Sequence, residues 1–306
     1  MQIPNENFNI SYADLEYLNG IVGYETVTLA GIEVAHQEVA LAQLAGWSGD
    51  NITSGLVGLA YPSITSAYAG TVALADNFSD PSSHLVYSPI INTIFFVENL
   101  TDSVFSLTLS RNPDPDYGFG GYITIGGIPD ITDPTVNASS KFVQTPILQV
   151  PFLGDAAAYA FYAIDVDALV YGKYKEADAE GATLYIVDSG TTLNYFTTED
   201  AKEFNALFNP PAENIEGLYF VECTAVPPNL GVTIAGETFY HNPIDLIFDE
   251  GIGNNTCISG VQDGGALGAG FFILGDVFQK NVLSVFDVGN EMMAFSAREY
   301  YDVPGY

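Results

Sequence analysis

The sequence predicts a mainly β protein, and two observations carry that prediction. Short apolar or alternating runs recur along the 306 residues, and each is bounded by Gly, Pro, Asn or Asp. Helical patterns, by contrast, are few. With 48% apolar and 15% charged residues, the chain is expected to fold, and its length allows one large core or two medium ones.

The expected elements follow from these runs in chain order. Strands are predicted at residues 8–12, 21–29, 105–109, 122–125, 161–166, 183–187, 218–221, 282–286 and 292–295. The clearest helix is predicted at 198–208, because Glu199 and Asp200 stand in its first turn, where the helix dipole favours acids. Its apolar face is expected to consist of Ala201, Phe204, Leu207 and Phe208.

Two lobes are expected, at residues 1–145 and 146–306. Residues 130–151 break the composition with several Pro, Asn and Ser residues. A weak internal echo crosses this break, since Gly-Leu-Val-Gly-Leu-Ala at 55–60 and Phe-Ile-Leu-Gly-Asp-Val at 272–277 both place an apolar pair before a glycine. The echo gains significance only if each copy accompanies an acidic loop.

The charge balance is strongly acidic, with 38 Asp and Glu against 7 Lys and Arg and a net charge of −31. Nucleic acid is an improbable partner, because phosphate binding needs clustered cations. Once the carboxylates are protonated, only the few basic residues stay charged, so the fold should tolerate acid better than base unless buried ionised carboxylates dominate. No apolar run is long enough for a transmembrane helix.

Several features favour the secretory route. Six Asn-x-Ser/Thr sequons occur, at Asn9, Asn51, Asn77, Asn99, Asn137 and Asn254. The two cysteines, Cys223 and Cys257, are then expected to form a disulfide worth roughly 3–4 kcal/mol, with two free buried thiols as the alternative. The first residues show no signal peptide, so the natural N-terminus is expected to lie upstream.

The stretch GATLYIVDSGTTLNYF at 181–196 is the most informative motif. An apolar run ends in Asp188, which is followed at once by a serine, a glycine and two threonines. Gly190 allows a tight turn that brings its N–H near the carboxylate, and the hydroxyls of Ser189, Thr191 and Thr192 are donors that could hold it. An aspartate that merely caps a β-turn is the alternative interpretation.

Five ordered motifs together resemble the pepsin-like aspartic endopeptidases. They are the hairpin ISY…NGIVGYETVTLAG at 10–31, GLVGLAYP at 55–62, VDSGTT at 187–192, FILGD at 272–276 and VFD at 285–287. The resemblance runs from about Phe8 to Ala297 and includes the late cysteine pair. It implies two similar β-lobes on either side of a deep cleft, each lobe contributing one Asp-Thr/Ser-Gly loop.

The resemblance also implies roles for individual residues. Asp188 is the second-lobe catalytic aspartate, with Gly190, Thr191 and Thr192 beside it at the substrate, and the segment 273–275 supports this loop from behind. Tyr12 matches the family's flap tyrosine, although a core aromatic is the alternative. The family's glycine-rich flap tip is replaced here by Ala-Asp-Leu-Glu-Tyr at 13–17, and Leu15 would be strained there if the turn required φ > 0.

The mechanism that the resemblance implies uses two carboxylates that share one proton and activate a water, with no metal and no cofactor. Asp188-Ser189-Gly190 is the only Asp-Ser/Thr-Gly sequence in the chain. The first-lobe aspartate is therefore expected upstream of the hairpin, the first lobe is expected to be incomplete, and the 306 residues alone should have little activity. The full-length protein is expected to be a monomer that cleaves polypeptides outside the cell or in a vacuolar or lysosomal lumen.

Two alternatives to the endopeptidase are also compatible with the sequence. A non-catalytic relative that binds polypeptide or glycan partners in the cleft would explain the absent acid and the altered flap, and self-association of two Asp188 loops is a third hypothesis. A metal site is not expected: residues 112–116 imitate a calcium loop but lack its later ligands, and His36, His84 and His241 show no paired metal spacing.

Overall fold

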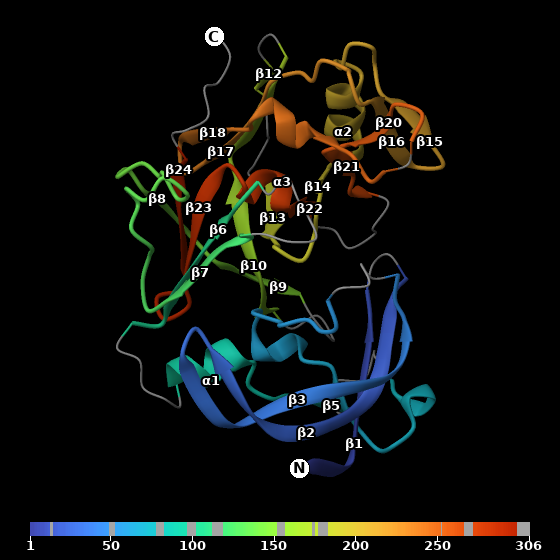
Figure 1. Cartoon of the computed structure of the whole chain (residues 1–306), viewed down its shortest axis with the longest axis vertical. Helices are drawn as coiled ribbons and strands as arrows, with labels where there is room; N and C mark the ends of the chain where they lie inside the picture. Colours follow the sequence, from blue (N-terminus) through green and yellow to red (C-terminus); the bar gives the residue numbers. More distant parts are fainter. Residues whose placement is uncertain are drawn as a thin grey trace. The chain divides into compact units, whose positions relative to one another are not determined.

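The chain divides into two compact units, which we describe separately (Figure 1). The computed structural model describes residues 1–12, 15–48, 53–77, 83–96, 102–111, 119–151, 157–172, 175–176, 183–251, 253–265 and 272–298. Unit 1 comprises Met1–Ser103 and Gln149–Phe161, and unit 2 comprises Val104–Leu148 and Tyr162–Tyr306. The lobe boundary expected between residues 145 and 146 stays a prediction, because the two units interleave around it.

Unit 1 is built on one five-stranded sheet of order β3-β2-β1-β4-β5. Its strands are β1 (Gln2–Ser11), β2 (Tyr17–Leu29), β3 (Ile32–Gly46), β4 (Ala67–Ala69) and β5 (His84–Leu85). β1 and β2 form an antiparallel hairpin in which Ser11 pairs with Tyr17. Helix α1 (Ile90–Phe96) packs against β3 and buries Ile91 and Ile94 completely. Two short 3₁₀ helices, η1 (Pro62–Ile64) and η2 (Ala73–Ala75), also lie in the described part of this unit.

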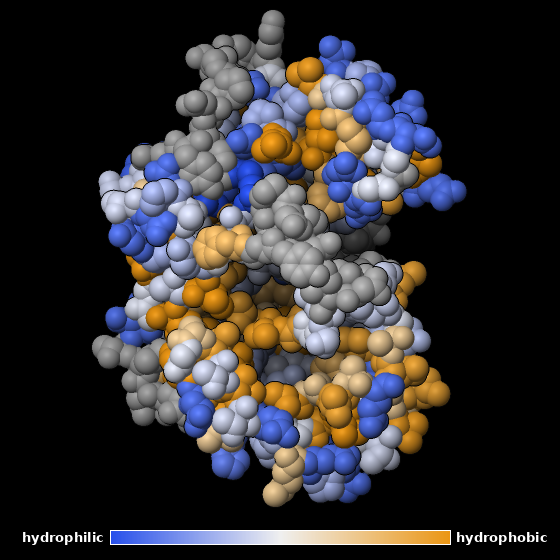
Figure 2. Space-filling model, in the orientation of Figure 1, coloured by the Kyte–Doolittle hydropathy of each residue, from blue (hydrophilic) through white to orange (hydrophobic). Residues whose placement is uncertain are grey.

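Apolar side chains also reach the surface of unit 1, as Figure 2 shows by colour. They include Leu41, Leu44, Trp47, Leu56 and Val57, each between 43% and 63% exposed. Residues 55–60, the first copy of the sequence echo, form no strand. The echo therefore does not extend to secondary structure.

The Asp188 motif begins in a sheet that belongs to unit 2 apart from its residues 149–151 and 157–161, which are part of unit 1. This six-stranded sheet has the order β21-β14-β22-β13-β10-β9. Its strands are β21 (Val261–Asp263), β14 (Asn194–Phe196), β22 (Phe272–Leu274), β13 (Thr183–Val187), β10 (Ala157–Val166) and β9 (Leu148–Pro151). β13 runs parallel to β22 and antiparallel to β10, so it is an interior strand. An interior strand covered on both faces needs a continuous apolar run, which explains why Tyr185, Ile186 and Val187 are all buried.

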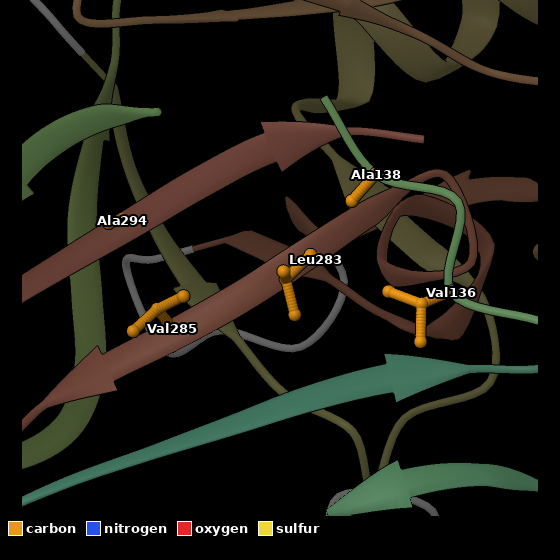
Figure 3. Packing of buried hydrophobic residues seen from close by; sticks show 5 residues of the cluster. All are labelled: Val136, Ala138, Leu283, Val285 and Ala294. Atoms are coloured by element: carbon orange, nitrogen blue, oxygen red, sulfur yellow. The ribbon is translucent and has the colours of Figure 1, made fainter. Parts of the chain in front are cut away.

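A five-stranded sheet of order β7-β6-β23-β24-β8 forms a second part of unit 2. Its strands are β7 (Gly121–Ile125), β6 (Val104–Leu109), β23 (Val282–Asp287), β24 (Met292–Ala297) and β8 (Val143–Pro146). Leu283 and Val285 lie two residues apart on β23 and share a cluster with Val136, Ala138 and Ala294 (Figure 3). Side chains two residues apart point to the same face of a strand, so Leu283 and Val285 together pack against the 131–138 segment.

Unit 2 also contains two four-stranded sheets, and the disulfide joins a strand of the second sheet to the residue after its neighbouring strand. The first sheet has β12 (Lys175–Glu176), β11 (Ala168–Tyr171), β17 (Leu230–Ile234) and β18 (Glu237–Tyr240); the second has β15 (Glu213–Ile215), β16 (Leu218–Glu222), β20 (Thr256–Ser259) and β19 (Ile247–Phe248). Cys223 and Cys257 form a disulfide with a Cα–Cα distance of 5.0 Å, which confirms the predicted bridge.

The helices in the described part of unit 2 are short: α2 (Thr198–Asn205), α3 (Asp276–Gln279) and the 3₁₀ helix η4 (Pro243–Leu246). The α2 helix begins where predicted, because the Thr197 hydroxyl accepts a hydrogen bond from the Asp200 N–H and caps the first turn. It ends at Asn205, three residues earlier than predicted. Leu207 consequently leaves the apolar face and is 46% exposed, so its predicted burial is wrong.

The predicted mainly β class is confirmed, and each of the nine predicted strands overlaps an observed one; β13 has the predicted bounds. No helix among the described residues is long and apolar enough to cross a bilayer. At the end of the described chain, Arg298 is 4% exposed and its guanidinium donates to four main-chain carbonyls. These belong to Leu109, Thr135, Val136 and Lys280.

Candidate active site

The Asp188 carboxylate stands at the end of β13, half-buried, and its own loop holds both oxygens. Gly190 N–H donates to Oδ1 at 2.9 Å, and the Thr191 hydroxyl donates to Oδ2 at 2.6 Å. Asp188 N–H donates to the Leu274 carbonyl at 3.1 Å, which fixes the backbone to β22. A Cβ on Gly190 would lie 3.2 Å from Asp188 Oδ1, so glycine permits the close approach of this N–H.

The segment after β22 supports the Asp188 loop from behind. Asp276 N–H donates to the Thr191 carbonyl at 2.8 Å, and Val277 N–H donates to the Thr192 carbonyl at 3.1 Å. A Cβ on Gly275 would lie 2.4 Å from the Thr191 carbonyl oxygen, so this approach requires glycine. In Figure 1 the labels β13, β14, β22 and α3 accordingly lie together in unit 2.

The predicted hydroxyl donors divide into two groups. Thr191 binds the carboxylate as predicted, whereas Ser189 and Thr192 are exposed and make no hydrogen bond to it in the described structure. The carboxylate is thus held by one hydroxyl and one N–H. Its half-buried position leaves it partly open to solvent.

Sequence reasoning missed a second acid, Asp276, beside this loop. Its Oδ1 is buried without a hydrogen-bond partner. Burial raises the pKa of Asp276 to about 7, with a further rise from the charge of Asp188 and an opposing effect from Lys280. The only signal in the sequence is an acid that follows β22 after a single glycine.

Two further polar residues, Asn194 and His241, are buried behind the loop and hydrogen-bonded to each other. They lie 47 residues apart in the sequence, so no local pattern connects them. Asn194 also accepts a hydrogen bond from Gly275 N–H at 3.0 Å. The pair therefore reaches the Asp188 loop through its supporting segment.

The predicted flap residue Tyr12 belongs to unit 1, at the end of the β1–β2 hairpin. Its N–H donates to the Glu16 carbonyl at 2.8 Å, and its ring contacts Trp47 edge to face at 5.7 Å. Glu16 Oε1 in turn accepts a hydrogen bond from Ser48 N–H at 2.7 Å, which ties the tip to the chain after β3. Leu15 has φ of 73°, so the strained conformation anticipated for it is present. Its neighbours Ala13 and Asp14 lie outside the described residues.

The sequons differ in accessibility. Asn77 and Asn254 are exposed and Asn137 is half-buried, whereas Asn51 and Asn99 lie outside the described residues. Asn9 is 7% exposed, and its amide nitrogen donates to the Ala73 carbonyl and to Asp76 Oδ2. A glycan bonded to that nitrogen conflicts with this hydrogen bonding.

One group of metal-type side chains comes together within the described part of the chain: Cys223, Cys257 and Asp249. The two sulfurs are joined in the disulfide, so they are not available as thiolate ligands. His241 bonds to Asn194 instead of joining a cluster. The disulfide therefore accounts for two of the three members of this group.

Comparison with known proteins agrees with this geometry. A model of the eukaryotic aspartyl protease family matches residues 1–298. A probable aspartic-type endopeptidase of Aspergillus fumigatus is 42% identical over 301 residues, which cover 97% of this chain and 65% of the relative. Rhizopuspepsin-4 of Rhizopus niveus is 29% identical over 282 residues, 92% of this chain and 60% of the relative.

The fold agrees as well. The crystal structure of an aspartic proteinase from Irpex lacteus superposes with a TM-score of 0.75 at 19% identity, covering 98% of this chain and 84% of that one. The chain thus spans slightly less than two thirds of the length of these two curated relatives. Its sequence match, its fold and its Asp188 loop together place it in one group: the chain belongs to the eukaryotic aspartyl protease family.

Proposed function

We propose that this chain provides one of the two catalytic aspartates of an acid-acting aspartic endopeptidase, and that Asp188 is that residue. The observation that carries the proposal is the carboxylate itself: it is partly open to solvent, yet each oxygen accepts a hydrogen bond from its own Asp-Ser-Gly-Thr loop. An aspartate that only caps a turn does not need both carboxylate oxygens fixed in place. A carboxylate that must meet a bound water in one orientation does.

The proposed chemistry needs a second carboxylate. Two carboxyl groups held close together share one proton. The ionised one acts as a base toward a bound water, and the protonated one polarises the scissile carbonyl. In this chain Thr191 and Gly190 would keep Asp188 aimed at that water through both protonation states.

We propose that the second carboxylate comes from a part of the protein outside these 306 residues. Two facts support this: the chain has a single Asp-Ser/Thr-Gly sequence, and it spans 65% of the Aspergillus fumigatus relative. The first-lobe segment that carries the partner aspartate would then complete unit 1. The 306 residues alone would not cleave polypeptides by the two-aspartate mechanism.

The setting of the proposed enzyme follows from its chemistry and its surface. Polypeptides are the substrate, Tyr12 closes over them as the flap, and Gly190, Thr191 and Thr192 border the scissile bond. We place the full-length protein outside the cell or in a vacuolar or lysosomal lumen, as a monomer, with glycans at the exposed Asn77 and Asn254. The disulfide suits an oxidising compartment.

Cleavage of a denatured protein at acid pH tests the proposal. The full-length natural product, extended upstream in the coding sequence, should cleave it in a pepstatin-sensitive way. Asp188→Asn should lower kcat at least ~10³-fold. Asp249→Asn is the matched control, because this exposed acid should lose its charge without changing kcat.

The other outcomes decide against the proposal. Cleavage that survives Asp188→Asn removes Asp188 from the chemistry. A full-length product that binds denatured polypeptide or glycans but never cleaves supports the non-catalytic alternative. Dimers of the natural product across the acid range, seen in sedimentation, would favour paired Asp188 loops instead of a monomer.

A further inference from the structure

Asn194 links the Asp188 loop to the interior of unit 2. It is the first residue of β14, six positions after Asp188, and its side chain is fully buried. Its Oδ1 accepts the Gly275 N–H at 3.0 Å, and its Nδ2 lies 3.1 Å from His241 Nε2. Gly275 immediately precedes Asp276, whose N–H holds the Thr191 carbonyl.

This geometry fixes the tautomer of His241. Since Gly275 N–H can only donate, the Asn194 atom facing it must be the oxygen, and the atom facing the imidazole must be the NH₂ group. His241 Nε2 therefore accepts and carries no proton. The ring proton is on Nδ1, which faces the Leu230 carbonyl at 3.3 Å. Neutral His241 satisfies every partner in this chain of hydrogen bonds.

The surroundings of His241 oppose a second proton. The residue is 3% exposed, and its ring packs against Phe278 of α3 at 5.8 Å. The charged groups that face it are Asp245 of η4 and Arg111 after β6, which form an ion pair with each other. β14 and β17 present only the Asn194 amide and the Leu230 carbonyl. Burial lowers the pKa of His241 to about 4, with Asp245 and Arg111 acting in opposite directions.

We propose that Asn194 and His241 are a pair of positioning residues for Asp188, and that they hold the catalytic loop only while the imidazole is neutral. A proton on Nε2 would place two donors, N–H and NH₂, face to face. Asn194 would then have to turn away from Gly275 or from His241. Either movement loosens the segment that supports Thr191, and with it the hydroxyl that orients the Asp188 carboxylate.

This inference rests on the proposed catalytic role of Asp188, but it adds a lower pH limit for activity that the catalytic role alone does not require. A pair of apolar side chains could fill the same space without any pH dependence. The polar pair makes the loop sensitive to strong acid, so the enzyme should lose its alignment below about pH 4 through His241, independently of the titration of the catalytic carboxylates.

His241→Gln tests the pair directly, because Gln offers an oxygen near the position of Nε2 but cannot be protonated. In the full-length product it should keep kcat near the wild-type value at pH 5. At pH 3 about a tenth of wild-type His241 is neutral, so wild-type kcat should fall about tenfold more than that of the variant, with KM little changed. His241→Leu, which removes the acceptor, should lower kcat at both pH values.

The control is His36→Gln, which changes an exposed histidine in unit 1 and should leave the pH profile unchanged. An NMR titration supplies a readout without catalysis: His241 should show a protonated Nδ1 and an unprotonated Nε2 down to about pH 4. A His241 that titrates near its ordinary pKa, or an acid limb unchanged by His241→Gln, overturns the inference. If the product cleaves nothing, the proposed function fails, whereas the NMR titration still decides on the pair.

Discussion

At the scale of single residues, the Asp188 carboxylate depends most on Thr191. The hydroxyl is 2.6 Å from Oδ2, and hydrogen bonds to ionised groups are worth about 1.5–3 kcal/mol. We predict that Thr191→Val lowers kcat of the full-length product about 10- to 100-fold, while Thr191→Ser retains most of it. Denaturant unfolding provides the check on stability. Equal kcat for the Val and Ser variants would show that the hydroxyl has no role.

Leu15 is a second single residue whose conformation lowers the stability of the fold. It is 85% exposed and has φ of 73°, so it pays for a left-handed conformation without gaining any packing. We predict that Leu15→Gly raises the free energy of unfolding by about 0.5 kcal/mol. Glycine relieves the backbone strain, but part of that gain is offset by the extra conformational entropy that it gives the unfolded chain. Leu15→Val should lower it by about 1 kcal/mol, because a β-branched residue fits this conformation worse. Denaturant titration showing equal stability for Leu and Val would contradict this.

At the scale of elements, the approach of β22 and α3 to the Asp188 loop depends on one position. A Cβ on residue 275 would lie 2.2 Å from the Leu193 carbonyl oxygen and 2.4 Å from that of Thr191. We predict that Gly275→Ala lowers the free energy of unfolding by about 3 kcal/mol, since main-chain atoms on both sides must move. Gly120→Ala, whose Cβ would meet nothing within 4 Å, should change it by less than about 0.5 kcal/mol. If thermal or denaturant unfolding shows similar losses of stability for the two variants, the close approach at residue 275 does not matter.

The elements also show what the sequence could predict. Strand β13 was predictable in full because its apolar run ends at an acid in a glycine-containing turn, and α2 was predictable at its start because Glu199 and Asp200 mark its first turn. The end of α2 was not, since Leu207 and Phe208 continue the apolar pattern after the backbone has left the helix. The Asn194–His241 pair was invisible, because its two members meet only through the tertiary fold. The second copy of the echo became a strand beside β13, whereas the first, at 55–60, did not.

At the scale of the whole molecule, different titratable groups make the free energy of unfolding change in opposite directions as the pH rises. Burial raises the pKa of Asp276 and of Glu38 to about 7, and the neighbouring Glu6 adds to the rise for Glu38. Their stabilising contribution is complete below the ordinary carboxyl pKa near 4 and is lost as the pH rises through 7. Burial lowers the pKa of His241 to about 4, so its contribution is complete above about 6.5 and is lost as the pH falls toward 4.

Between pH 4 and 6.5 the two carboxyl groups outweigh the one histidine, so we predict that the free energy of unfolding is greatest near pH 4 and falls toward pH 8. The net charge of −31 adds repulsion on the neutral side. Asp276→Asn should remove roughly 3 kcal/mol of the loss between pH 5 and pH 8, because the amide resembles the protonated acid. Chemical denaturation at pH 4, 5.5 and 8 measures the curve. A variant with the same slope as the wild type above pH 5 would mean that Asp276 does not titrate there.

The arginine at position 298 has a consequence for how the chain withstands degradation. Its single guanidinium fills a site made by carbonyls from three segments that are distant in sequence. A carboxypeptidase that reaches this residue should stall, because removing it takes away the donors that the guanidinium supplies to these carbonyls. Mass spectrometry of a prolonged digest should then find a long-lived species that ends in this arginine.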